Sequence, residues 1–362
     1  MKIVKYGLIV IFFILAAIFF NHFRCNRISK KYLPEPPEPY AGPEIHMAAM
    51  RGDIEVVKSI LREKPELLTQ TDKYENYPLH LAAYKGHTEI VQFLISRGAD
   101  INVRNNFGGT PLLVASYAGG TEVVKVLIAN GADTNLAIED SGQQVLQVAS
   151  LEGYRDYSHM YTALGGIINL KVHFIATPLQ AAAANGYREI AEILIAGGAN
   201  VNSKPTGYTA LHSAAVNGQK ELVEFLIVKG AEINAEAECG LTPLCSAMFW
   251  CREPVDRDSI SEVAKILIEN GADVNVRTQG GFTPLHWAAG WANKETVQLL
   301  LSAGAEINAK SEEGDTPLNV ACRYRRKNKG GVIDLLHKNG AVRRHGKNNS
   351  YEYEPDLIGM WP

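Results

Sequence analysis

The chain has 362 residues, a formal net charge of −3 at pH 7, 46% hydrophobic residues and five cysteines. A nearly neutral chain lacks the basic excess of a dedicated nucleic-acid-binding protein, and this apolar content is ordinary for a packed domain. The cysteines have no C-x-x-C spacing, so no metal site is predicted, and disulfides become an option only if the domain is exported.

The N-terminal segment, residues 1–24, contains an uninterrupted apolar run from Gly7 to Phe20. A bilayer span usually needs about 17 to 25 residues, so the run is short for a span and long for a signal-peptide core. No small residues follow Phe20 where a signal would be cleaved, and we therefore expect a short hydrophobic helix that anchors the chain as a single membrane pass. A cleaved signal that exports the chain, and a lipoprotein attached at Cys25, are the alternatives. The basic residues on the two sides of the run are nearly balanced, so the sequence leaves the orientation open.

Two further segments flank the central part of the chain. Residues 25–43 form a linker that is first basic and then rich in proline, and its second part is expected to be a semi-rigid polyproline spacer of about 30 Å. A disordered tether is the alternative. The C-terminal tail, residues 343–362, has enough apolar residues to fold back on the domain or to serve as a peptide motif for another protein.

Between these segments the tetrapeptide T-P-L-H and its variants return at a nearly fixed step. Copies that start at Thr209 and Thr242, and at Thr283 and Thr316, lie 33 residues apart. Threonine is a good N-cap, and proline suits the first position of a helix. An apolar stripe, a glycine, a second apolar helix and a further glycine follow in each unit. A repeat of this length predicts a solenoid of stacked helix-turn-helix-loop units.

The repeated residues resemble the ankyrin repeat. Residues 78–91 match the T-P-L-H-x-A-A and G-H-x-E-I-V parts of that signature from its proline onward, and residues 282–289 match the first part. The resemblance implies an all-α ankyrin-repeat solenoid over residues 44–342 with about nine units. The Gly-Ala motif that follows the second helix recurs at Gly98, Gly131, Gly198, Gly230, Gly271 and Gly304.

Three of the nine units depart from the pattern. The fourth, residues 144–176, keeps the length of a unit but not its letters, and we expect a degenerate repeat; an irregular, poorly packed region is the alternative. The seventh unit has eight extra residues in the turn between its helices, around residues 250–258. The ninth has about three extra residues near residues 323–329. Insertions in solenoids map to loops on one face, often the binding face.

No catalytic pattern accompanies the repeats. The chain has no P-loop, no G-x-S-x-G and no H-E-x-x-H motif. His80, His212 and His286 share one position of the unit, and the ankyrin resemblance implies structural hydrogen bonds for them. We therefore expect a non-enzymatic protein without cofactors, metal, nucleic-acid partner or small-molecule substrate.

The resemblance also implies where a partner protein would bind, because ankyrin repeats usually meet their partners with loop tips and with outward positions of the first helix. Aromatic residues at those positions are not required for folding and supply much of the energy at interaction hot spots. Packing under a neighbouring insertion is the alternative for some of them. We expect a non-catalytic protein–protein interaction module that is presented from a membrane anchor and binds its partner through the concave face and the loop tips. The alternative is a structural scaffold or stabilising element of a membrane complex without a discrete ligand. The candidate partner-binding residues are Tyr74, Asn76, Tyr84, Lys85, Phe107, Tyr117, Tyr208, Phe249, Trp250, Phe282, Trp291 and Tyr324.

Overall fold

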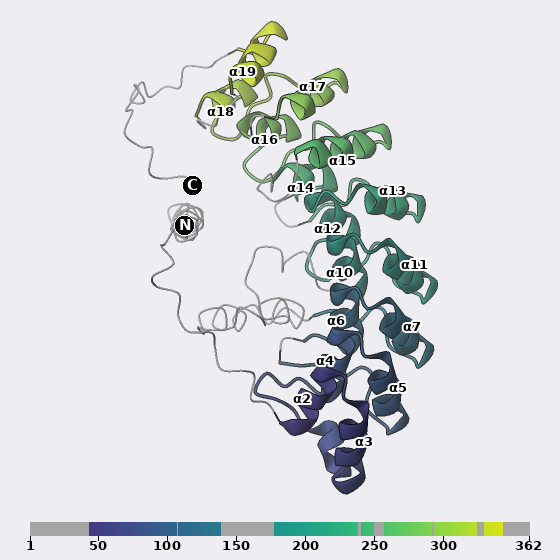
Figure 1. Ribbon diagram of the computed structural model, residues 1–362. Coiled ribbons are helices and arrows are strands. Elements are labelled where there is room, and N and C mark those ends of the chain that lie inside the picture. The colour runs from purple at the N-terminus through teal and green to yellow at the C-terminus, as the bar shows by residue number, and fades with distance from the viewer. Residues whose placement is uncertain are drawn as a thin grey trace, which may run out of the picture. The chain divides into compact units, whose positions relative to one another are not determined.

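The computed structural model describes residues 43–106, 108–138, 177–237, 240–249, 257–291, 293–323 and 329–342. Within these ranges the secondary structure is entirely helical, with sixteen α-helices and one short 3-10 helix, which confirms the predicted all-α class (Figure 1). None of the described helices is long and apolar enough to cross a membrane. The expected anchor at residues 1–24, the linker up to residue 42 and the tail 343–362 lie outside the described residues.

The helices come in pairs, one pair to a unit. First helices pack on first helices of the next unit, as α4 does on α6, and second helices pack on second helices, as α5 does on α7. Figure 1 shows these as two rows, here called the first-helix row and the second-helix row. The pairs are α2 (Glu44–Arg51) with α3 (Ile54–Glu63), which η2 (Pro65–Thr69) follows; α4 (Pro78–Lys85) with α5 (Thr88–Ser96); α6 (Pro111–Ala118) with α7 (Thr121–Ala129); α10 (Pro178–Asn185) with α11 (Arg188–Ala196); α12 (Ala210–Val216) with α13 (Lys220–Val228); α14 (Pro243–Phe249) with α15 (Arg257–Glu269); α16 (Pro284–Gly290) with α17 (Lys294–Ser302); and α18 (Pro317–Arg323) with α19 (Lys329–Lys338).

The first helices begin where the T-P-L-H pattern predicts. Thr177 precedes α10 in extended backbone, and its hydroxyl accepts a hydrogen bond from the backbone N–H of Gln180 at 3.2 Å. Pro178 follows at the first helical position, where no N–H donor is lost. Gly186 then ends the helix with a φ of 75°, a left-handed conformation that costs glycine least.

The core lies between the two rows and runs continuously through the stack. In the second unit, Leu79, Ala82 and Ala83 of α4 meet Ile90 and Leu94 of α5, and all five are at most 2% exposed. The alanines leave room for the neighbouring first helices to approach closely. Because each unit buries its apolar faces against its neighbours, the layers depend on one another for stability.

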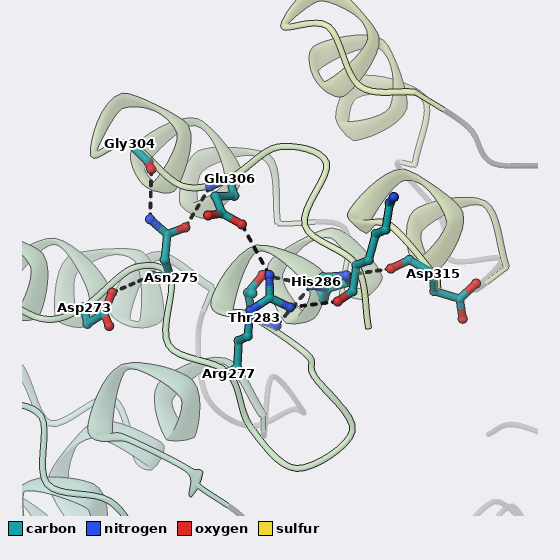
Figure 2. Close-up of polar contacts among 9 residues, drawn as sticks. Asp273, Asn275, Arg277, Thr283, His286, Gly304, Glu306 and Asp315 are labelled. Atoms are coloured by element: carbon teal, nitrogen blue, oxygen red, sulfur yellow. Dashed lines mark hydrogen bonds and ion pairs between the residues drawn. The ribbon is translucent and has the colours of Figure 1, made fainter. Parts of the chain in front are cut away.

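At five joints of the stack, an asparagine near the end of one unit is tied to the next unit through two hydrogen bonds; these residues are Asn135, Asn202, Asn234, Asn275 and Asn308. Asn234 donates from Nδ2 to the carbonyl of Gly271 at 3.0 Å and accepts at Oδ1 from the N–H of Asp273 at 2.9 Å. Figure 2 shows the same bridge one joint further, from Asn275 to Gly304 and Glu306. These asparagines bridge the loops of successive units along the stack.

Units three and five are joined directly by such a bridge. Asn135 donates to the carbonyl of Gly198 at 3.0 Å, and the N–H of Asn200 donates to Oδ1 of Asn135 at 2.8 Å. Helix α6 packs on α10, and α7 packs on α11, as helices of successive units do elsewhere. The expected fourth layer therefore does not stand between them, and residues 139–176 lie outside the described residues.

The physical reason is that a joint is made by particular residues and not by the spacing alone. Unit five presents the complete set of partners to unit three, including the Gly198 carbonyl. The sequence of the expected fourth unit lacks the Thr-Pro start of a first helix, and the residues expected for its second helix are rich in Tyr, Ser and His.

The long seventh unit differs from the expectation in one detail. Its second helix, α15, has 13 residues, whereas α13 has nine. The helix begins at Arg257, so residues 257 and 258, which were expected in the turn, are helical. The remaining residues of the expected inserted turn, 250–256, lie outside the described part of the chain, as do residues 324–328 of the ninth unit.

Candidate functional site

The histidines that share one position of the unit act as structural clamps. Nδ1 of His212 accepts from the N–H of Thr209 at 3.1 Å, and its Nε2 donates to the carbonyl of Leu241 at 3.1 Å. Figure 2 shows the same arrangement for His286, between Thr283 and Asp315. Burial lowers the pKa of His212 to about 4, so the ring is neutral at physiological pH. These bonds bear out the structural role that the ankyrin resemblance implied.

Gln180 occupies the same place in unit five. Its Oε1 accepts from the N–H of Thr177 at 3.0 Å, and its Nε2 donates to the carbonyl of Tyr208 at 2.6 Å. An amide thus makes both hydrogen bonds of the histidine without a titratable group.

Two candidate residues at the first loop tip lie inside the fold. Asn76 is fully buried, and Tyr74 is 8% exposed. The backbone N–H groups of both residues donate to Oδ1 of Asp72 at 2.8 Å, and Nδ2 of Asn76 donates to the other oxygen at 3.0 Å. Asn105 of the next loop donates to Oδ1 of Asn76 at 2.9 Å. Asn76 therefore shapes the loop and ties two units together, and its side chain is not available to a partner.

Two other tip aromatics, Tyr208 and Phe282, are half-buried. Their rings pack against the clamp histidines of their own units, with centroids 5.7 Å from His212 and 5.4 Å from His286. Each ring therefore supports a clamp while part of it stays accessible.

Three candidate residues gather at a hollow along the C-terminal ends of the first helices. Tyr84 and Lys85 end α4 in unit two, and Tyr117 lies near the end of α6 in unit three. Asn185 and Tyr187 of unit five complete the lining together with Ala118, and the cavity has a volume of about 340 Å³. The hollow thus draws on units two, three and five.

A missing side chain explains why this hollow exists. In three of the described turns between the helices, a side chain lies over the glycine that ends the first helix of the preceding unit. A Cβ placed on Gly52 would lie 2.8 Å from His87, and one on Gly119 would lie 2.9 Å from the Tyr187 ring. In unit three the corresponding position is Gly120, and a Cβ on Gly86 would meet nothing within 4 Å. The surface beside Tyr84 is therefore left uncovered.

The backbone at Gly120 does not require glycine. Its φ and ψ are −79° and 70°, and those of Gln219 at the same place in unit six are −83° and 75°. A Cβ on Gly120 would find its nearest neighbours at 3.7 Å, an ordinary contact distance. Glycine at this position accordingly creates space rather than relieving strain.

The chemistry of the hollow is aromatic and polar. Burial, followed by the nearby Tyr117 and Tyr187, raises the pKa of the Tyr84 hydroxyl to about 12. That hydroxyl therefore stays protonated and can donate a hydrogen bond. Nζ of Lys85 lies 5.3 Å from the centroid of the Tyr84 ring and is exposed to solvent. Nδ2 of Asn185 donates to the carbonyl oxygens of Ala181 and Tyr117, at 3.0 and 3.4 Å, which holds α10 against α6.

The remaining candidates lie elsewhere on the chain. Trp291 directly follows α16 and is half-buried, and Phe249 is the last residue of α14. Phe107, Trp250 and Tyr324 lie outside the described residues.

Sequence reasoning missed Asn185 and Tyr187. Tyr187 takes the place of the histidine in the G-H-x-E-I motif, a signal that the sequence contains. It could not be linked to Tyr117 as long as a fourth layer was expected between their units.

The model of the family "Ankyrin repeats (3 copies)" matches residues 45–138, 90–164, 146–237 and 255–343. The chain therefore belongs to the ankyrin repeat family, whose members are generally non-catalytic protein–protein interaction modules. Two of the matches extend into residues 139–176, which keep a sequence likeness to the family although units three and five pack on each other. No curated protein matches the chain.

Proposed function

We propose that the chain binds another protein through the hollow lined by Tyr84, Tyr117 and Tyr187, and that its N-terminal segment presents this surface from a membrane. The observation that carries the binding part is the convergence of three tyrosines from three units on one open cavity. Tyrosine offers a large rigid contact area and a polar tip, which suits it to interaction surfaces.

The fold itself does not require tyrosine at the position of Tyr84 and Tyr117. The positions equivalent to Tyr84 hold Met50 in unit one, Ala184 in unit five and Val216 in unit six. The first helices of those units are regular and end at a glycine in units one and five and at an asparagine in unit six. A first helix of this fold therefore forms without an aromatic residue at this position, which supports a role in binding for Tyr84 and Tyr117.

A site-specific photo-crosslinker tests this surface. With p-benzoylphenylalanine in place of Lys85, irradiation of cells that express the full chain should yield an adduct with one partner protein. Position 224, an exposed residue on the second-helix row, serves as the control and should not yield that adduct. Identical adducts from both positions, or adducts only between copies of the chain, would overturn the proposal; the second result would favour a scaffold.

The apolar run at residues 7–20 supports the membrane part of the proposal. Alkaline carbonate extraction should leave the full chain in the membrane fraction and release a chain that lacks residues 1–24. Release of the full chain by carbonate would contradict an anchor, and a mature N-terminus beyond residue 20 would show a cleaved signal. Protease protection of intact vesicles would then give the side on which the repeats lie.

A further inference from the structure

We propose that the occupant of the hollow is a proline-rich segment of a partner protein, in polyproline II conformation, with an acidic residue beside its prolines. This inference rests on the proposed function of the hollow and names the chemistry of its ligand.

The lining residues argue against the other common ways of binding a peptide. An amphipathic helix needs a groove of aliphatic side chains, but the hollow contains no Leu, Ile, Val or Met. Strand addition needs the edge of a sheet, and the described ranges contain no strand. Recognition of a phosphate group usually relies on an arginine cluster, whereas Lys85 is the one cation among the lining residues. Aromatic-lined grooves are the typical sites for polyproline II segments.

The usual separation of the helices that carry the rings fits such a segment. Tyr84 and Tyr117 come from successive units, whose packed helices are typically about 8–10 Å apart. A polyproline II helix has three residues in a turn and rises about 3.1 Å for each, so one turn advances about 9 Å. Prolines one turn apart can therefore meet both rings in succession.

The hydroxyl groups of the hollow also suit a polyproline II segment. Polyproline II has no internal hydrogen bonds, so its carbonyl oxygens need outside donors. The Tyr84 hydroxyl, half-buried and protonated at neutral pH, and the hydroxyl of Tyr187, which also lines the hollow, can supply them.

Lys85 gives the site its charge preference. No acidic residue pairs with its ammonium group in the part of the chain that the structure describes, and it lies at the rim beside Tyr84. A carboxylate next to the prolines would meet this cation, whereas a basic residue would be repelled.

A direct titration tests the proposal with a fluorescein-labelled peptide of the sequence PEPPEP. The protein is the full chain in which Pro34, Pro36, Pro37 and Pro39 are replaced by alanine, so that its own proline run cannot compete with the probe. We expect saturable binding and, with Gly120→Gln, a Kd at least tenfold higher, because the glutamine would fill the space beside Tyr84 as Gln219 covers Gly186. Ala129→Gln, on the exposed end of α7, is the matched control and should leave the Kd unchanged.

Two further comparisons test the charge preference and the requirement for proline separately. Lys85→Glu should weaken binding of PEPPEP by about fivefold or more and should strengthen binding of PKPPKP. A peptide AEAAEA that binds as well as PEPPEP would overturn proline recognition, and an unchanged Kd in Gly120→Gln would overturn the site. If no proline peptide binds but the photo-crosslinker at position 85 still gives an adduct with a partner protein, the proposed ligand class is wrong and the proposed function stands. If that adduct is absent as well, the proposed function is also wrong.

Discussion

Asn135 donates a hydrogen bond to the carbonyl of Gly198 at 3.0 Å, although the two residues are 63 positions apart in the sequence. Equivalent bridges elsewhere join units that follow each other without interruption, as Asn202 and Gly230 do, 28 positions apart. Units three and five are thus direct neighbours in the stack.

Deletion of residues 139–172 should therefore leave the solenoid intact. The deletion places Thr177 33 residues after Thr110, the regular step of this chain. Because the cost of closing a loop grows slowly with its length, we expect the free energy of unfolding to change by no more than about 1 kcal/mol. Denaturant unfolding checks this, and a broad or absent transition in the shortened chain would show that the deleted residues support the stack.

Gly120→Gln should stabilise the protein while it closes the hollow. The replacement restricts the unfolded chain at a position whose φ suits any residue, an effect of about 0.4–1 kcal/mol. By analogy with Gln219, which donates to the carbonyl of Ala184 at 3.4 Å, the new amide can donate to the carbonyl of Tyr84. A thermal unfolding midpoint below that of the native chain would contradict this geometry.

Asn76→Ala should be strongly destabilising, in contrast to Tyr84→Phe. The first change removes a fully buried amide that bonds to both Asp72 and Asn105, and the loss is expected to be about 2–3 kcal/mol. The second removes one half-buried hydroxyl from the lining of an open hollow and should cost less than about 0.5 kcal/mol. Equal effects in chemical denaturation would mean that the two residues do not differ as their burial indicates.

Stability should fall on acidification, and His212 should account for part of the loss. Its pKa in the folded protein is lowered to about 4, so below pH 6.5 the unfolded chain takes up a proton that the folded chain refuses. The contribution is complete above pH 6.5 and disappears as the pH falls towards 4, with a loss of about 2 kcal/mol at pH 5. His212→Gln should reduce this slope between pH 7 and pH 5, because Gln180 shows that an amide can make both hydrogen bonds. An unchanged slope in denaturant titrations would contradict the assignment.

The local parts of the fold could be predicted from the sequence because short-range chemistry decides them. A threonine cap, a proline at the first helical position and a glycine stop act within a few residues, as Thr177, Pro178 and Gly186 show. The clamp histidines followed from the family pattern for the same reason.

The composition of the hollow could not be predicted, because it depends on which units touch. Equal spacing suggested a layer between Tyr117 and Tyr187, whereas the bridge from Asn135 places their units in contact. Asn76 was misjudged for a different reason. A loop-tip position suggests exposure, but both the backbone N–H and the side-chain amide of Asn76 donate hydrogen bonds to the Asp72 carboxylate, and the residue is buried.

The closed joint between units three and five also has a mechanical consequence. A pulling force applied along the solenoid would pass from α6 to α10 and through the Asn135–Gly198 bridge, because these contacts connect the two halves in space. Residues 139–176 connect the two halves through the chain, whereas the joint connects the same halves through non-covalent contacts, so the two connections lie side by side along the direction of the force. Residues 139–176 would come under tension only after that joint had broken.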